Sequence, residues 1–171
     1  MKTGSEKKIG QGMLILAMLI AMALMTYFFG KLEKNQRNPN QAPQSVSDTH
    51  FVDVILEQNR SGHYVTTGTI NGIEVEFLLD TGATDVVVPA QLADELALVR
   101  GYKGRALTAN GSVTVYSTTI SQLSIGQISL QNVRASINPS MHTHGILLGM
   151  SALRELEFIQ RGKFLTIRQH Y

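Results

Sequence analysis

Residues Phe77–Val88 read Phe-Leu-Leu-Asp-Thr-Gly-Ala-Thr-Asp-Val-Val-Val. Three apolar residues run directly into Asp80, so the pattern predicts a buried strand whose carboxylate emerges at the strand end. Thr81 and Gly82 then turn the chain and let other backbone come close. An isolated Asp-Thr-Gly is usually a plain turn, but a carboxylate at the end of a buried strand costs free energy unless the protein uses it. The flanking sequence therefore decides between a turn and a site.

From residue 51 onward the sequence predicts a mostly β body. Short apolar runs alternate with Gly and Asn, and Asn71-Gly72 is a strong hairpin signal between two of them. Two short helices are expected, at Ala90–Leu98 after Pro89 and at Met150–Glu155. The expected strands are Phe51–Glu57, His63–Ile70, Ile73–Leu79, Val86–Val88, Arg105–Thr108, Ser112–Ser117, Gln122–Ile125, Ile128–Val133, Phe158–Gln160 and Phe164–Ile167. Many short strands with few helices predict a small closed or folded-over β domain.

Composition narrows the classes of function. The 171 residues contain no cysteine, which excludes disulfide frameworks, thiolate zinc sites and cysteine nucleophiles. The basic charge is concentrated at one end, because residues 1–50 hold six Lys or Arg against three acids, whereas residues 51–171 hold nine against ten. A nearly neutral body without a basic face does not favour nucleic-acid binding.

The segment Met13–Phe29 contains 17 residues without a charge, which is at the lower edge of what spans a bilayer. A cleaved signal peptide is the alternative, since Lys2, Lys7 and Lys8 precede the segment and Ala21-Met22-Ala23 has the small-x-small form. Cleavage there would fall inside the apolar run, so we expect an uncleaved anchor. The basic residues before the helix favour a single pass through the inner (cytoplasmic) membrane, with the C-terminal body on the periplasmic or another extracytoplasmic side.

These observations divide the chain into four expected parts. Residues 1–12 form a basic tail, residues 13–30 a transmembrane helix, residues 31–50 a flexible linker rich in Asn, Gln, Pro and Ser, and residues 51–171 the folded domain.

Two ordered motifs give the body a family resemblance. The stretch Phe77–Val88, with its Asp-Thr-Gly-Ala after an apolar run, resembles the active-site motif of retropepsin-like aspartic proteases. Gly145-Ile146-Leu147-Leu148-Gly149 is similar to the apolar segment that crosses behind the catalytic loop in that family. The resemblance, which extends to the bacterial membrane-anchored branch, implies an acid-protease closed β-barrel with one or two short helices. It also implies peptide hydrolysis without a cofactor or a metal.

The resemblance implies roles for individual residues. Asp80 would be catalytic, Thr81 and Gly82 would support the active-site loop, and a hairpin tip at Ala109, Asn110 and Gly111 would form the flap over the substrate. The residues expected to bind substrate are Ala83, Thr84, Asp85, Val88 and Ile146.

The chemistry of the family implies a homodimer. Two carboxylates share one proton in aspartic proteases, but this chain holds a single Asp-Thr-Gly and a body too short for two lobes. The second Asp80 would therefore come from a second subunit on a twofold axis. The expected partners are a second copy of the chain, a peptide or protein substrate and the membrane.

The sequence departs from the viral pattern at two positions. Viral members usually have Asp where this chain has Thr84 and Arg where it has Met150, and those two residues form an ion pair. Both are replaced here, so neither charge is left without its partner. Dimer contacts and recognition of the substrate ends are therefore expected to differ, with Asp85 taking part in the latter.

Two alternatives stay open. A catalytically silent dimeric module of the same fold would bind peptides or act as a scaffold, and a self-processing enzyme would cut near Phe51-Val52. His142-Thr143-His144 has the form of a metal-binding pair but lacks an evident third ligand. Gly149–Leu153 lacks the second Gly of a serine-hydrolase nucleophile elbow.

Overall fold

The computed structural model describes residues 3–108, 111–143 and 145–171. The chain divides into two compact units, residues 1–36 and residues 37–171. The first unit is helical. The second unit, which we call the body, contains the strands.

Helix α1 (Thr3–Arg37) includes the predicted membrane segment and extends beyond it in both directions. Its stretch Gly10–Arg37 has 28 residues and a mean hydropathy of 2.2, which is long and apolar enough to cross a bilayer. The apolar side chains of this stretch are all exposed; Met13, Phe28 and Phe29 each expose more than half of their surface. By length and composition this stretch could cross a membrane, and a signal sequence would have the same character.

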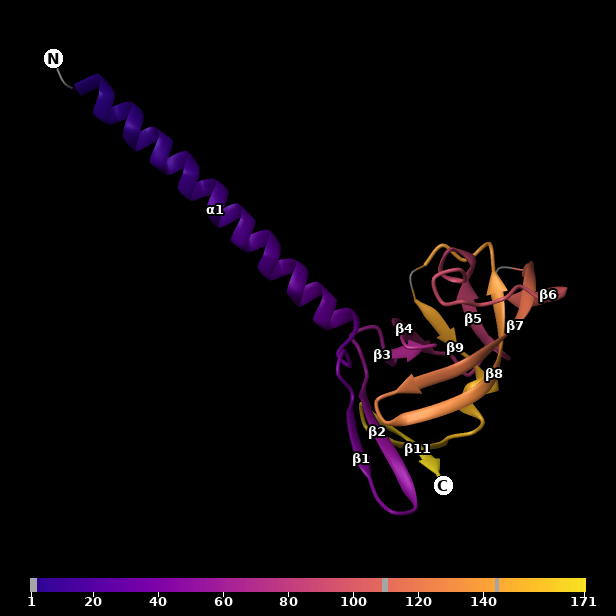
Figure 1. Cartoon of the computed structure of the whole chain (residues 1–171). Helices are drawn as coiled ribbons and strands as arrows, with labels where there is room; N and C mark the ends of the chain where they lie inside the picture. Colours follow the sequence, from indigo (N-terminus) through magenta and orange to yellow (C-terminus); the bar gives the residue numbers. More distant parts are fainter. Residues whose placement is uncertain (1–2, 109–110, 144) are drawn as a thin grey trace. The chain divides into compact units, whose positions relative to one another are not determined.

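The body is built mainly of strands, as predicted (Figure 1). Its elements in order are β1 (Gln44–Ser47), β2 (Phe51–Glu57), β3 (Val65–Ile70), β4 (Ile73–Leu79), β5 (Val86–Pro89), η1 (Ala90–Leu92), β6 (Lys103–Thr108), β7 (Gly111–Ile125), β8 (Ile128–Asn138), β9 (Ile146–Leu148), α2 (Met150–Leu153), β10 (Glu157–Arg161) and β11 (Phe164–His170). The hairpin between β3 and β4 turns at Asn71 and Gly72, both with positive φ, as its sequence predicts.

Hydrogen bonds close six strands into a ring. The order β3-β4-β9-β5-β8-β7 returns to its start because β7 also pairs with β3, and β6 extends the sheet beside β7. β9 lies between β4 and β5, parallel to the first and antiparallel to the second. The ring agrees with the predicted closed β domain and places the ends of β4 and β9 next to each other.

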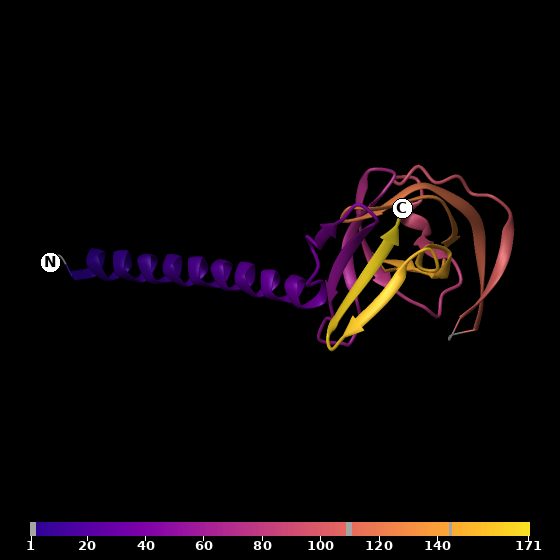
Figure 2. The same ribbon diagram turned by 90° about the horizontal axis from the view of Figure 1, so that it is seen from below.

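A second, antiparallel sheet has the order β1-β2-β11-β10. In Figure 2 its C-terminal hairpin, β10 and β11, is the pair of yellow arrows. Alternate residues of β2 (Val52, Val54 and Leu56) point into the core and are no more than 1% exposed. They pack with Phe77 and Ile146 of the ring in one continuous apolar core.

The segment after α1 differs from the predicted flexible linker over residues 31–50. The helix continues through Arg37, Asn38 and Asn40 are buried at 2% and 6% exposure, and β1 pairs with β2. A polar composition predicts a linker, but here the side-chain amides of these two Asn residues form hydrogen bonds to β2 and β3. We call Arg37–Asn40 the strap.

Residues 90–98 differ from the predicted helix. Only η1 is helical, and turns follow it as far as residue 97. Ala97 has a φ of 54°, a left-handed conformation that ends helical geometry. Leu98 is buried, and Val99, which follows the predicted helix, is 82% exposed.

Candidate active site

Asp80 follows the last residue of β4, where the sequence predicts it. Its backbone N–H donates to Leu148 O at 3.1 Å, and its carboxylate Oδ1 accepts the backbone N–H of Gly82 at 2.9 Å. The residue is half-buried, whereas Phe77 three positions earlier is fully buried. The rigid strand and the turn at Thr81 and Gly82 therefore hold the carboxylate in one orientation at the protein surface.

The segment that contains β9 crosses the loop 80–85 from behind, as the resemblance implies. Met150 N–H donates to Ala83 O at 2.8 Å, and Ser151 N–H donates to Thr84 O at 2.9 Å. Gly149 permits this contact, because a Cβ there would lie 2.1 Å from Asp85 O. The loop that carries Asp80 is thus fixed by backbone hydrogen bonds to a distant part of the chain.

Ser151 adds a second support that the sequence did not reveal. Its hydroxyl, on a residue only 3% exposed, accepts Val86 N–H at 2.9 Å and donates to Arg134 O at 2.6 Å. One side chain therefore ties β5, β8 and α2 together under the site. Its only sequence signal is its place directly after the Gly149-Met150 pair, and these bonds give it a structural role.

The Asp85 carboxylate forms an ion pair with Arg134, which is different from the Asp–Arg pair expected in the viral proteases. Its Oδ1 accepts Arg134 Nε at 2.6 Å, with the Asp85 side chain 29% exposed. Arg134 comes from β8, 49 residues away in sequence, so no local motif announces it. Asp85, which we expect to help recognise the substrate ends, is therefore already paired with Arg134.

An open cavity of about 780 Å³ lies along this side of the body. Its apolar lining includes Leu78, which is two positions before Asp80, and Leu147, which is two positions before Gly149. The full lining is Arg37, Asn59, Ser61, His63, Val65, Glu76, Leu78, Thr108, Val113, Asn138, Ser140, Met141, His142, Thr143, Gly145 and Leu147. The cavity therefore adjoins the segments that carry and support Asp80.

The hairpin of β6 and β7 contributes to the cavity from the other side, through Thr108 and Val113. Thr108 pairs with Gly111, whose φ is 107°, and the Thr108 hydroxyl donates to Gly111 O at 2.8 Å. Of the predicted flap tip, Gly111 lies at the start of β7, and Ala109 and Asn110 fall outside the described residues. The described part of this hairpin therefore lines the cavity, and a flap role for its tip stays a prediction.

Two of the predicted substrate-binding residues are on the wrong face. Val88 and Ile146 are 0% exposed and belong to the core, so they offer no surface to a substrate. Strand alternation puts their neighbours Val87 and Leu147 on the opposite face, where both are half-buried. Ala83 is half-buried and Thr84 is exposed, as a contact role requires.

The charged side chains on the cavity wall are Arg37 and Glu76, and the imidazoles of His63 and His142 also line it. Arg37 and Glu76 form an ion pair through Nη2 and Oε1. Within residues 3–108, 111–143 and 145–171 no three His, Asp or Glu side chains are grouped as metal ligands. His144, the second His of the His142-Thr143-His144 motif, falls outside those ranges.

Comparisons with known proteins agree with this geometry. The family model described as gag-polyprotein putative aspartyl protease matches residues 66–155, just over half of the chain. The crystal structure of a retropepsin-like aspartic protease from Rickettsia conorii superimposes with a TM-score of 0.61 at 24% identity. The match covers 74% of this chain and 96% of that one, and it shows the common fold.

Two curated relatives are both described as uncharacterized. One, encoded in the cobV 5′ region of a Sinorhizobium species, is 31% identical over 111 residues, which cover 63% of this chain and 48% of the relative. The other, from Rickettsia prowazekii (strain Madrid E), is 25% identical over 122 residues, or 70% of this chain and 52% of the relative. The chain thus spans about half the length of these relatives. From the matched motif region, the ring of strands and the crossing behind Asp80, we conclude that the chain belongs to the gag-polyprotein putative aspartyl protease family and has the retropepsin-like fold.

Proposed function

We propose that the protein is a membrane-anchored aspartic endopeptidase that is active as a homodimer. The observation that carries this proposal is the half-buried Asp80 carboxylate, which Gly82 N–H orients two residues beyond Leu78, a residue that lines the large cavity. Membership of an aspartyl protease family supports it. Catalysis by Asp80 is our inference from this geometry.

The need for two carboxylates supports the dimer. The chain contains one Asp-Thr-Gly, and aspartic protease chemistry uses two Asp side chains that share a proton because like charges so close cannot both ionise. Thr81 and Gly82 are exposed in the single chain, so this surface is accessible to a second copy. In a twofold dimer the Thr81 hydroxyls would bond across the axis and hold the two loops rigid.

The reaction would then proceed without a covalent enzyme intermediate. An ionised Asp80 removes a proton from a water molecule held between the two carboxyl groups, and the oxygen of that water attacks the peptide carbonyl carbon. The protonated Asp80 of the partner subunit donates its proton to the carbonyl oxygen. As the tetrahedral diol collapses and the C–N bond breaks, the protonated Asp80 would donate its proton to the leaving nitrogen and the ionised Asp80 would take the proton of a diol hydroxyl, so that the pair again holds one proton.

The cavity lining suggests how a peptide would bind. An extended substrate would place apolar side chains against Leu78 and Leu147, beside Ala83 and Thr84 of the loop, while the hairpin of β6 and β7 closes over it and excludes water. Leu147 replaces Val88 and Ile146 in this proposal because only its face of the sheet reaches the cavity.

The apolar stretch of α1 supports the proposed anchor. We place the anchor in the inner membrane with the body on the extracytoplasmic side. Confinement to a membrane raises the effective concentration of subunits, so a dimer that is weak in solution would still assemble.

The test is cleavage of a mixed peptide library by the full-length protein in detergent micelles from acidic to neutral pH, compared with Asp80→Asn. Cuts made by the wild type and absent from the variant would support the proposal. Binding of peptides without cutting would instead identify a silent peptide-binding module. Self-cleavage at Phe51-Val52 is disfavoured, because both residues lie within β2 and pair with β11, so the folded chain does not present this bond.

A further inference from the structure

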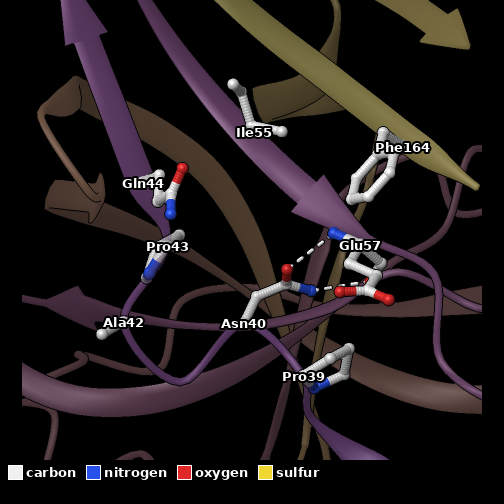
Figure 3. A pocket seen from close by; sticks show the side chains of 8 residues that line it. All are labelled: Pro39, Asn40, Ala42, Pro43, Gln44, Ile55, Glu57 and Phe164. Carbon is white, nitrogen blue, oxygen red and sulfur yellow. Dashed lines mark hydrogen bonds between the residues drawn. The ribbon is translucent and has the colours of Figure 1, made fainter.

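The strap is fastened to the body by the Asn40 side chain (Figure 3). Its Nδ2 donates to Glu57 O at 2.9 Å and to Val65 O at 2.7 Å, and its Oδ1 accepts Glu57 N–H at 2.6 Å. These bonds join the end of β2 to the start of β3, beside a small cavity of about 190 Å³ that Pro39 and Asn40 help to line. The Asn40 side-chain amide therefore forms hydrogen bonds with the backbone of both segments, as a neighbouring strand would.

The rest of the strap is fastened as firmly. Asn40 O accepts Thr67 N–H at 3.0 Å, and Asn38 Oδ1 accepts Asn40 N–H at 2.9 Å. Asn59 Nδ2 donates to Arg37 O at 3.0 Å. Buried amides bonded on this scale hold a segment in one position, so the backbone of Arg37 is fixed at the edge of the 780 Å³ cavity.

The Arg37 side chain is placed to meet a ligand in that cavity. It lines the wall next to Glu76, and 62% of it is exposed, compared with 23% for Glu76. A guanidinium carries five N–H donors, and the bond to Glu76 engages Nη2. The Arg37 guanidinium therefore remains accessible from the cavity while it is paired with Glu76.

The strand geometry gives the distance from the reacting bond. Glu76 and Leu78 lie on one face of β4, and Asp80 follows at the next position on that face. At about 3.3 Å per residue, Glu76 is about 13 Å from Asp80, a span that three or four residues of an extended peptide cover.

We propose that Arg37, positioned by the strap, is a specificity-determining residue that selects peptides with an acidic side chain three or four residues from the cleaved bond. The inference rests on the proposed function, because it assumes that the peptide runs from Asp80 along this cavity. In this proposal the strap forms part of the substrate-binding pocket.

The test uses full-length protein in detergent micelles at pH 7 and fluorescent dodecapeptides with a central Leu-Leu pair. The peptides carry Asp, Asn or Lys at the third or fourth position from the centre, on either side. Binding is measured by anisotropy with the Asp80→Asn protein, so that it does not depend on cleavage. The variants Arg37→Ala and Arg37→Glu are added to this background. The matched control is Lys163→Ala, which removes another exposed ion pair, to Glu57, outside the cavity.

We expect the Asp peptide to bind about tenfold more tightly than the Asn peptide at one of these positions, the scale of a charge-assisted hydrogen bond. Arg37→Ala should reduce the difference to within about twofold, Arg37→Glu should favour the Lys peptide, and Lys163→Ala should behave as its parent. An Asp preference that is absent from the parent protein, or that survives Arg37→Ala, overturns the inference. Failure of the proposed function appears separately, as no Asp80-dependent cleavage of any peptide by the wild type.

Discussion

Replacing Asn40 by Ala tests whether the strap is a structural element or the flexible linker that composition predicts. The substitution removes three hydrogen bonds, to Glu57 N, Glu57 O and Val65 O, from a side chain on a residue that is 6% exposed. At about 1 kcal/mol per bond, with a further cost for the polar groups left unpaired, the free energy of unfolding should fall by about 2–4 kcal/mol. At about 3 °C per kcal/mol for a body of this size, the melting temperature should fall by about 6–12 °C.

Differential scanning calorimetry of the full-length protein in detergent, at one scan rate, measures this change. The control is Gln131→Ala, which removes an amide from an exposed position on β8 and should change the free energy of unfolding by less than about 0.5 kcal/mol. If the Asn40→Ala and Gln131→Ala proteins have the same melting temperature, residues 38–40 behave as a flexible linker and the strap does not stabilise the body.

Three further predictions concern the site. Gly149→Ala should abolish cleavage and lower the melting temperature, because its Cβ would lie 2.1 Å from Asp85 O; a fully active variant would show that the crossing is looser than described. Ser151→Ala should lower the free energy of unfolding in urea by about 1–3 kcal/mol, since Val86 N–H loses its acceptor, and an unchanged midpoint would contradict this. Leu147→Ala should shift the library cuts, identified by mass spectrometry, toward bulkier apolar side chains, and an unchanged profile would remove this residue from the pocket.

The sequence predicted those parts of the fold that local rules govern. Asn71-Gly72 set one hairpin, and the alternation in Phe51–Glu57 set the buried face of β2. The apolar run into Asp80 correctly predicted a strand that ends at a carboxylate on the surface. These features depend on residues adjacent in the chain, and for that reason they were readable.

The features that the sequence did not predict depend on distant partners. Asn40 looks like a linker residue until β2 and β3 supply backbone groups for its amide, and Arg134 is matched to Asp85 only by the β5–β8 pairing. Val88 and Ile146 were assigned to the substrate-binding face of their strands, but both side chains point into the core. A wholly apolar run does not reveal which of its two faces is buried.

The central claim is that each active site contains Asp80 from two chains, and a mixing experiment tests it most directly. A fixed amount of wild-type protein is combined in the same liposomes with increasing Asp80→Asn, and the rate of peptide cleavage is measured. The control is added Asp94→Asn, which changes an exposed Asp elsewhere and keeps Asp80. We predict that Asp80→Asn reduces the rate toward zero as mixed dimers form, whereas Asp94→Asn raises it. A rate that stays constant as Asp80→Asn is added would mean that one chain holds a complete site, which contradicts the proposed dimer.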